Sequence, residues 1–275
     1  MTQMDMTTDN MAGVQGDEIK TCCSAAYASD WARHLLGESF HPGGLALTKR
    51  LGTLLNLGPG KRLLDVAAGK GASAIFLAQQ CGCEVVGVEY GHQLVSEATR
   101  AAEAAGIAHL VRFEQGDAER LAFADNQFDA VMCECAFCTF PNKKAAGGEF
   151  ARVLRPGGSI GLADLTRSGE VPPELQGLTA WIACIADALS TAEYAHYLGD
   201  AGLVVDRFEP HDEALTTLVH DIRMKLLAAE LLVKLKQVNL PFLDFERAKA
   251  LARAADEPVK DGRFGYVLIT AAKPG

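Results

Sequence analysis

The sequence has no block of lysine and arginine to offset its formal net charge of -9. This absence argues against non-specific binding to nucleic acid or to an anionic membrane surface. No uncharged run approaches the roughly 18 residues of a membrane-spanning helix. The polar, acidic segment over residues 1–17 lacks the cationic start and apolar stretch of a signal peptide or leader. These absences predict a cytoplasmic protein with a small-molecule partner, without nucleic acid or membrane as partners, and they leave the oligomeric state open.

The length and apolar content are sufficient for a full hydrophobic core. A chain of 275 residues with 49% apolar composition fits one large domain, with room for a modest appendage. Its 8 cysteines are a further feature. In a cytoplasmic chain they favour reduced thiols with metal, redox or catalytic roles over a disulfide framework.

Strand and helix patterns alternate along most of the chain. We expect strands over 62–66, 83–89, 111–115, 128–133, 159–164, 204–210 and 264–271. We expect helices over 21–37, 45–55, 71–81, 91–105, 143–154, 191–201, 215–235 and 245–254. This βαβα order predicts an α/β fold, with a doubly wound, mostly parallel seven-stranded sheet and helices on both faces.

The pattern also suggests a division of the chain into four parts. We expect a mobile tail over 1–20, an N-terminal cap segment over 21–44, a core over 45–210, and a helical insertion with the final strand of the sheet over 211–275. The cap joins a polar tail to the core through an aromatic helix and a Pro-Gly-Gly turn, and we expect it to close over bound ligands.

One strand runs directly into a glycine turn that opens a helix. Gly69 and Gly71 let the backbone approach a ligand without an intervening Cβ, and Asp65 offers a carboxylate beside the turn. Glu89 ends the next strand, where an acid can accept both hydroxyls of a ribose. The pattern predicts a cofactor that carries adenosine, and it leaves a dinucleotide and S-adenosylmethionine as alternatives.

This region resembles the class I S-adenosylmethionine-dependent methyltransferases. Their turn has an acid followed by three alternating glycines, and this chain has Ala67 at the first glycine position, which narrows the freedom of the turn. The other matching segments are Gly116-Asp117-Ala118, Leu121-Ala122-Phe123, Phe128-Asp129-Ala130-Val131 and Arg152-Val153-Leu154-Arg155-Pro156-Gly157-Gly158. The resemblance implies a Rossmann-like fold over about residues 45–210 and S-adenosyl-L-methionine as cofactor. The residues expected to bind it are Asp65, Ala67, Gly69, Gly71, Glu89, Tyr90, Asp117, Ala118, Cys133 and His41.

The loop after the fourth strand should border the methyl donor, because ligands of open α/β sheets lie beyond the carboxyl ends of the strands. This loop carries Cys133, Cys135 and Cys138, and thiolates favour soft, thiophilic centres. It lacks the Asn-Pro-Pro-Tyr of many enzymes that methylate nitrogen. It is similar to the arsenite methyltransferases, whose substrate cysteine precedes Pro-Asp-Lys; Cys135, before Pro141-Asn142-Lys143, is the match.

A second cysteine segment supports the same resemblance. The segment 181–189 is similar to the family's Cys-Leu-Gly-Gly-Ala-Leu and implies Cys184 as another arsenic ligand, although both family glycines are missing. We assign the reaction to Cys135, Cys184 and Cys138. The residues expected to bind the acceptor are Cys22, Cys23, Glu134 and Asp164. We interpret Cys81 and Cys83 as packing residues and assign no resident metal, while a zinc site from Cys135, Cys138, Cys22 and Cys23 is an alternative.

The sequence thus predicts transfer of the methyl of S-adenosylmethionine to a soft nucleophile. Trivalent arsenic is the first choice, because a cysteine-rich site without an evident catalytic histidine suits an acceptor that needs no strong base. The alternatives are a small thiol such as hydrogen sulfide or methanethiol, carbon or oxygen of a small metabolite, and a non-catalytic metalloid or redox sensor on the same fold.

Overall fold

The computed structural model describes residues 15–28, 41–171, 173–175, 180, 184–235 and 245–275. Its strands are β1 (Arg62–Val66), β2 (Glu84–Glu89), β3 (Val111–Gln115), β4 (Phe128–Glu134), β5 (Leu154–Arg167), β6 (Val204–Pro210) and β7 (Phe264–Ala272). Its helices are α1 (Gly16–Ala28), α3 (Gly44–Leu54), α4 (Ala72–Cys81), α5 (His92–Ala104), α6 (Lys143–Val153), α8 (Thr191–Asp200), α9 (Asp212–Lys234) and α10 (Phe245–Lys260), with 3-10 turns η1 (Phe137–Thr139) and η2 (Pro173–Leu175).

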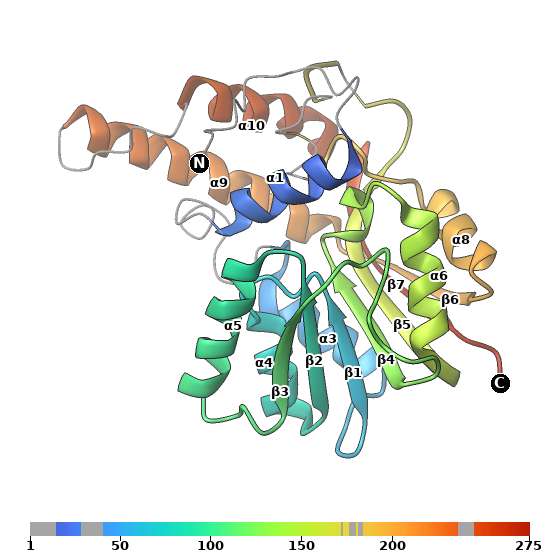
Figure 1. Cartoon of the computed structure of the whole chain (residues 1–275). Helices are drawn as coiled ribbons and strands as arrows, with labels where there is room; N and C mark the ends of the chain where they lie inside the picture. Colours follow the sequence, from blue (N-terminus) through green and yellow to red (C-terminus); the bar gives the residue numbers. More distant parts are fainter. Residues whose placement is uncertain (1–14, 29–40, 172, 176–179, 181–183, 236–244) are drawn as a thin grey trace.

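The seven strands form one sheet in the order β3-β2-β1-β4-β5-β7-β6 (Figure 1). The first five strands are parallel, and β7 runs antiparallel to both β5 and β6. The direction of winding reverses between β1 and β4, which is the place where open α/β sheets bind ligands. The predicted fold class is confirmed.

Alternating side chains of the central strands build two hydrophobic cores. In β1, Leu64 and Val66 pack in the core that contains α6 and α8, whereas Leu63 packs in the core that contains α3 and α4. This period of two produces a buried strand covered by helices on both faces. Cys83 belongs to the second core and Cys81 packs against it, so the interpretation of both as packing residues is confirmed.

Most predicted strands match the structure closely, but β5 is longer than the predicted 159–164. Its last residues, Leu165–Arg167, pair with Phe264–Tyr266 of β7. The partner strand lies almost a hundred positions away in the sequence, so the extension has no local signal. Long strands of this kind are fixed by pairing rather than by propensity.

The N-terminal boundary differs from the prediction. Helix α1 covers Gly16–Ala28 and begins inside the predicted mobile tail, and the predicted helix over 21–37 is therefore placed too late. Asp17 and Glu18 lie in its first turn, where their negative charges interact favourably with the positive end of the helix dipole. Residues 1–14 and 29–40 lie outside the described part of the chain.

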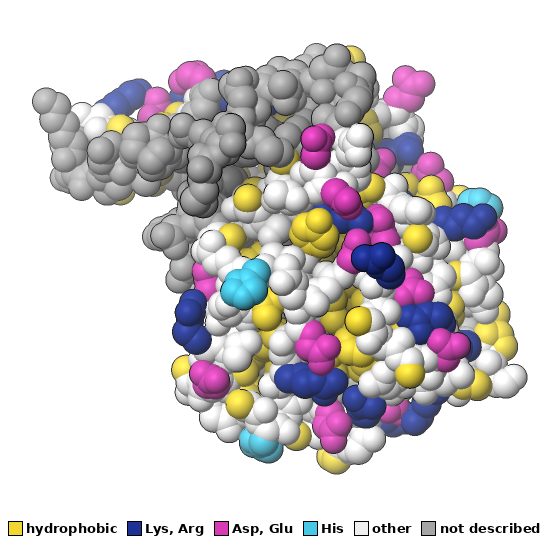
Figure 2. Space-filling view, viewed as in Figure 1, with side chains coloured by type: hydrophobic (Ala, Val, Ile, Leu, Met, Phe, Trp, Pro, Cys, Tyr) yellow, Lys and Arg dark blue, Asp and Glu magenta, His cyan; other side chains and the backbone are white. Residues whose placement is uncertain are grey.

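Two surface properties concern possible partners. No described helix is long and apolar enough to cross a membrane. Figure 2 shows acidic and basic side chains interspersed over the described residues of one face, without a large basic patch there.

Candidate active site

A cavity lies at the carboxyl ends of β1, β2 and β4, and α1 crosses this edge of the sheet (Figure 1). It contains most of the predicted cofactor residues. Those that line it are His41, Asp65, Ala67, Gly69, Glu89, Tyr90, Asp117 and Ala118. Glu134, Cys135 and Cys23 line the same cavity. The remaining predicted residues lie around it or in the core, as described below.

Gly71 is required by the conformation and packing of the turn. It precedes α4 with a left-handed backbone at φ 83°, and a Cβ built there would lie 2.5 Å from Cζ of Phe113. A side chain at this position would be strained by its backbone and would clash. Gly71 therefore shapes the turn from behind, although it does not line the cavity itself.

Two carboxyl groups beside the turn are suited to polar groups of a cofactor. The backbone amides of Gly69 and Gly91 each donate to a different carboxylate oxygen of Glu89 at 3.0 Å, which fixes its orientation. Asp65 is buried, and its Oδ2 has no hydrogen-bond partner within the described residues. Burial, assisted by the charges of Glu134 and Glu89, raises the pKa of the Asp65 carboxyl well above its usual range. An unpaired buried oxygen facing a cavity is suited to a donor from a ligand.

Ala67 adopts a left-handed backbone with φ 59°. This conformation costs a residue with a Cβ about 1–2 kcal/mol, and glycine adopts it without that cost. Alanine at the family's first glycine position therefore keeps a left-handed backbone, and the cost is conformational strain at Ala67 and not a change of turn.

Replacing Ala67 by glycine is expected to stabilise the protein by about 0.5–1 kcal/mol, because the relieved strain exceeds the added entropy of the unfolded chain. Urea unfolding monitored by circular dichroism measures this change. The control is Ala68→Gly at the next position, which is not left-handed, and this change should destabilise. Equal destabilisation by both substitutions would contradict strain at Ala67.

Helix α1 is tied to the cavity by an ion cluster that the sequence analysis missed. The ammonium of Lys20 contacts Asp117 at 2.9 Å and Glu119 at 2.6 Å, and the Lys20 side chain is 11% exposed. Burial lowers the pKa of Lys20, but hydrogen bonds to Glu119 and Asp117 outweigh burial and raise it overall. Because Lys20 and Asp117 are 97 positions apart, no sequence spacing indicates this contact. The pair places Lys20, Cys23, Ser24 and Tyr27 of α1 along one wall of the cavity.

Replacing Lys20 by methionine should weaken S-adenosylmethionine binding by roughly threefold to tenfold, because α1 would have to be ordered as the ligand binds. Titration calorimetry measures the affinity, and limited proteolysis should cleave α1 faster in the variant. Lys61→Met removes the ion pair with Asp129 at the amino ends of β1 and β4, away from the cavity, and serves as the control. Unchanged affinity and cleavage in Lys20→Met would show that α1 is held without this contact.

His41 and Glu134 are joined in a buried polar network. The carboxylate of Glu134 lies 3.4 Å from Nε2 of His41 and accepts hydrogen bonds from the hydroxyls of Thr48 and Ser73. Nδ1 of His41 contacts the carbonyl of Pro42 at 3.1 Å. Both ring nitrogens of His41 therefore have protein partners, which leaves the imidazole poorly placed to act as a free base. Thr48 and Ser73 were not predicted, because nothing in their local sequence indicates a role.

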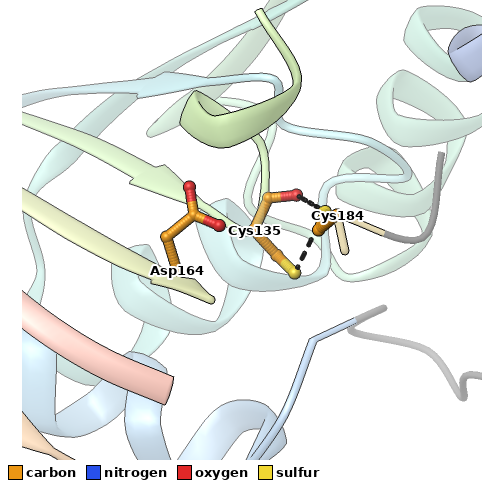
Figure 3. Close-up of side chains that lie close together, drawn as sticks. All are labelled: Cys135, Asp164 and Cys184. Carbon is orange, nitrogen blue, oxygen red and sulfur yellow. Dashed lines mark hydrogen bonds between the residues drawn. The ribbon is translucent and has the colours of Figure 1, made fainter. Parts of the chain in front are cut away.

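Cys135 lines the cavity, and Cys184 lies next to it behind the cavity wall (Figure 3). Sγ of Cys135 lies 3.6 Å from Sγ of Cys184, although 49 positions separate the residues. Sγ of Cys184 also lies 3.1 Å from the carbonyl oxygen of Cys135. Hydrogen bonds from the thiols of Cys135 and Cys138 lower the pKa of Cys184 well below its usual range, whereas the hydrogen bond to Cys184 and burial raise that of Cys135. The two sulfur atoms therefore belong to one partly buried hydrogen-bonded pair, in which Cys184 also contacts the backbone of Cys135.

Backbone strain is concentrated at the same residues. Five described residues other than glycine have positive φ, and two of them are asparagines, which tolerate this region. The other three are Ala67, Cys135 at φ 52° and Cys184 at φ 63°. One lies in the glycine turn and two carry the paired sulfur atoms, and strained residues of this kind cluster at functional sites.

Cys138 and Asp164 were also predicted at the reaction site, and both lie outside the lining of the cavity. Cys138 lies behind the pair, with its Sγ 3.8 Å from the carbonyl oxygen of Cys184. Asp164 is fully buried at the end of the parallel part of β5 and accepts hydrogen bonds from the amides of Cys138 and Leu165, each at 2.9 Å. Burial, with a contribution from the charge of Cys184, raises the pKa of Asp164 to about 7. Neither residue lines the cavity itself.

Cys133 and Cys22, two further cysteines expected at the site, also lie outside the lining of the cavity. Cys133, expected to bind the cofactor, is fully buried in the core on one face of the sheet, because successive residues of a strand point to opposite faces. Cys22 packs with Ala26 on α1, whereas its neighbour Cys23 lines the cavity. Burial raises the pKa of Cys23 to about 12, and the charges of Cys184 and Cys22 contribute. Of the N-terminal pair, Cys23 is therefore the residue near the paired sulfur atoms.

Comparison with known proteins shows the family to which the chain belongs. A protein-family model described as a methyltransferase domain matches residues 64–162. The 27-O-demethylrifamycin SV methyltransferase of Amycolatopsis mediterranei is 30% identical over 269 residues, which cover 90% of this chain and 94% of that protein. The chain belongs to the S-adenosylmethionine-dependent methyltransferases. The enzyme therefore uses S-adenosylmethionine, as predicted.

Two further similarities bear on fold and acceptor. The solved structure of the [4+2]-cyclase SpnF has a TM-score of 0.76 at 21% identity and covers 94% of this chain and 96% of that one, which establishes similarity of fold alone. An arsenite methyltransferase of Halobacterium salinarum is 29% identical over 164 residues, or 58% of this methyltransferase and 41% of that protein. The relatives thus differ in the acceptors for which they are named.

Proposed function

We propose that this methyltransferase transfers the methyl of S-adenosylmethionine to trivalent arsenic held by Cys135 and Cys184. The proposal rests chiefly on the distance of 3.6 Å between the two sulfur atoms, one of which belongs to a residue that lines the cofactor cavity. Soft thiolates prefer soft centres such as trivalent arsenic. The partial similarity to an arsenite methyltransferase agrees with it.

The cofactor assignment within this proposal follows the cavity. Glu89 would accept hydrogen bonds from the ribose hydroxyls, and Asp117 and Ala118 would border the adenine. Asp65 would accept a hydrogen bond from the methionine end of the cofactor. Tyr90 and the turn around Gly69 complete that wall. When bound, S-adenosylmethionine supplies an electrophilic methyl on a positively charged sulfur.

The acceptor chemistry requires alignment more than proton transfer. In the proposed transfer, the lone pair of arsenic would bond to the methyl carbon while the carbon–sulfur electron pair returns to sulfur, so that S-adenosylhomocysteine would leave and arsenic would become pentavalent. No proton is removed from the acceptor, which agrees with a site in which both nitrogens of His41 already have protein partners. The role left to Cys135 and Cys184 is to hold the lone pair in line with the methyl group. Cys23 on α1 is the candidate for a third thiolate, since it lines the same cavity.

The proposal is tested by incubating the reduced enzyme with labelled S-adenosylmethionine and one acceptor at a time. The acceptors are arsenite, selenite, hydrogen sulfide, methanethiol and a quinone precursor. Label in a methylated arsenic species, separated by chromatography, is the expected result. Activity with methanethiol and none with arsenite would move the function to small-thiol methylation.

Methylation of an oxygen on a small metabolite is the second candidate. It is favoured by the relative named for 27-O-demethylrifamycin SV, which aligns with nearly the whole chain. Under this alternative the cysteines have no part in the reaction, so turnover of the oxygen acceptor should survive replacement of Cys135 and Cys184. The two candidates thus make opposite predictions for the same variants.

A further inference from the structure

Three ligating atoms from separate parts of the chain converge at the end of the cavity. They are Sγ of Cys135 after β4, a carboxylate oxygen of Asp164 on β5, and Sγ of Cys184 before α8, and all lie within 4.8 Å of one another. Figure 3 shows the three side chains close together, with Cys135 drawn between Asp164 and Cys184. Residues brought together from three segments form a defined site and not a local sequence motif.

The carboxylate distinguishes this set from a site made for arsenic alone. Trivalent arsenic is held by thiolates, whereas Zn²⁺ and Cd²⁺ bind thiolate sulfur and carboxylate oxygen together. Asp164 is fully buried, and the amides of Cys138 and Leu165 already orient its two oxygens. Such outer hydrogen bonds hold a ligating carboxylate in place and leave a lone pair on each oxygen for a metal.

The charge around the three residues also favours a cation. Cys184 is 1% exposed and Asp164 is 0% exposed, so neither acid is well solvated by water. The charge of Lys143 acts on Cys184, but its ammonium is already ion-paired with Asp187. A divalent cation between the two sulfur atoms and the carboxylate would compensate the negative charge that these groups carry when ionised.

The number of ligands indicates the type of site. Structural zinc sites usually have four protein ligands, whereas catalytic sites have three and leave one position for water or substrate. Here Cys135 lines the cofactor cavity, while Cys184 and Asp164 lie behind it. The fourth position of a cation bound to these three residues would therefore face the cavity.

We propose that Cys135, Asp164 and Cys184 form a binding site for a thiophilic divalent cation of the Zn²⁺ or Cd²⁺ class, with its open position directed toward the methyl donor. The site overlaps the one proposed for arsenic, so a bound cation competes with that acceptor. Cation binding itself does not depend on the identity of the acceptor. Only the competition rests on the proposed function.

The first test is equilibrium dialysis of the reduced enzyme against Cd²⁺ or Zn²⁺, without S-adenosylmethionine or arsenite. One equivalent should bind, and Cys135→Ser, Cys184→Ser and Asp164→Asn should each lower its affinity by at least about tenfold. Cys81→Ser is the matched control, because Cys81 is a partly exposed thiol of the second core outside the cavity. Unchanged affinity in any of the three variants would overturn the three-ligand site.

The Asp164→Asn variant distinguishes binding of the cation from binding of arsenite. Its affinity for Cd²⁺ should fall while arsenite binding stays within about threefold, since arsenic needs the thiolates and not the carboxylate. Equal losses of both ligands would argue that Asp164 acts through the fold, and would overturn its role as a ligand. Failure of wild-type enzyme to methylate arsenite, with Cd²⁺ binding intact, would refute the proposed acceptor and leave the cation site standing.

X-ray absorption of the zinc-loaded wild-type enzyme provides a test that needs no variant to fold. The expected shell has two sulfur ligands at about 2.3 Å and oxygen ligands at about 2.0–2.2 Å. A shell with three or four sulfur atoms would place Cys138 or Cys23 in the site instead of Asp164 and would overturn the proposal. A shell without sulfur would overturn it as well.

Discussion

Methyl transfer to arsenite is expected to fall at least about a hundredfold when Cys135 and Cys184 are both replaced by serine. Such a loss corresponds to about 2.7 kcal/mol of transition-state stabilisation. Serine has nearly the size of cysteine, but its hydroxyl is hard and protonated and does not hold a soft centre. Binding of S-adenosylmethionine should stay within about threefold, because neither sulfur atom belongs to the wall that carries Glu89 and Asp117.

The measurement is initial rate with arsenite and, in parallel, with methanethiol, together with calorimetric binding of S-adenosylmethionine and a thermal unfolding scan. Cys81→Ser is the control for general damage, since Cys81 only packs against the core. Cys138→Ser and Cys23→Ser should lie between the control and the double variant. Full activity on arsenite in the double variant would refute arsenic held by these cysteines.

Binding of S-adenosylmethionine is expected to weaken by at least about tenfold when Glu89 is replaced by alanine. Hydrogen bonds to a charged acceptor contribute about 1.5–3 kcal/mol each, and the carboxylate is proposed to accept two from the ribose. The same carboxylate accepts the amides of Gly69 and Gly91, so its loss also loosens the turn around the cofactor. Titration calorimetry measures the affinity directly.

The matched control is Glu84→Ala on the same strand. Glu84 begins β2 with its side chain 58% exposed, whereas Glu89 ends the strand inside the cavity. Glu84→Ala should leave the affinity for S-adenosylmethionine unchanged. If Glu89→Ala also leaves it unchanged, the assignment of the ribose to Glu89 is wrong.

The sequence was a good guide where structure depends on local patterns. The strand from Arg62 to Val66 and the turn after it were predicted residue by residue, because buried parallel strands are short apolar runs that end at glycine. The carboxyl edge of such a sheet is also a general binding place, so Asp65 and Glu89 at the ends of two strands were expected at one cavity. These features require only the chain nearby and a rule of topology.

Contacts between distant segments were predicted poorly or only through resemblance. Helix α1 begins inside the predicted tail, and nothing in the local sequence signals the contact of its Lys20 with Asp117. The approach of Cys184 to Cys135 was expected from family similarity, not from spacing. Cys133 was misplaced because a single strand position decides between core and cavity.

The place of β7 in the sheet has a consequence for how the chain folds. This strand comes from the C-terminal end of the sequence, yet it lies between β5 and β6 and pairs with both. Until residues 264–272 are available, the edges of β5 and β6 have no partner, and unpaired edges invite association with other chains. Closing these contacts requires distant segments to meet, which is slow relative to local pairing. During synthesis, completion of this part of the sheet therefore depends on β7, which emerges after both of the strands that it joins.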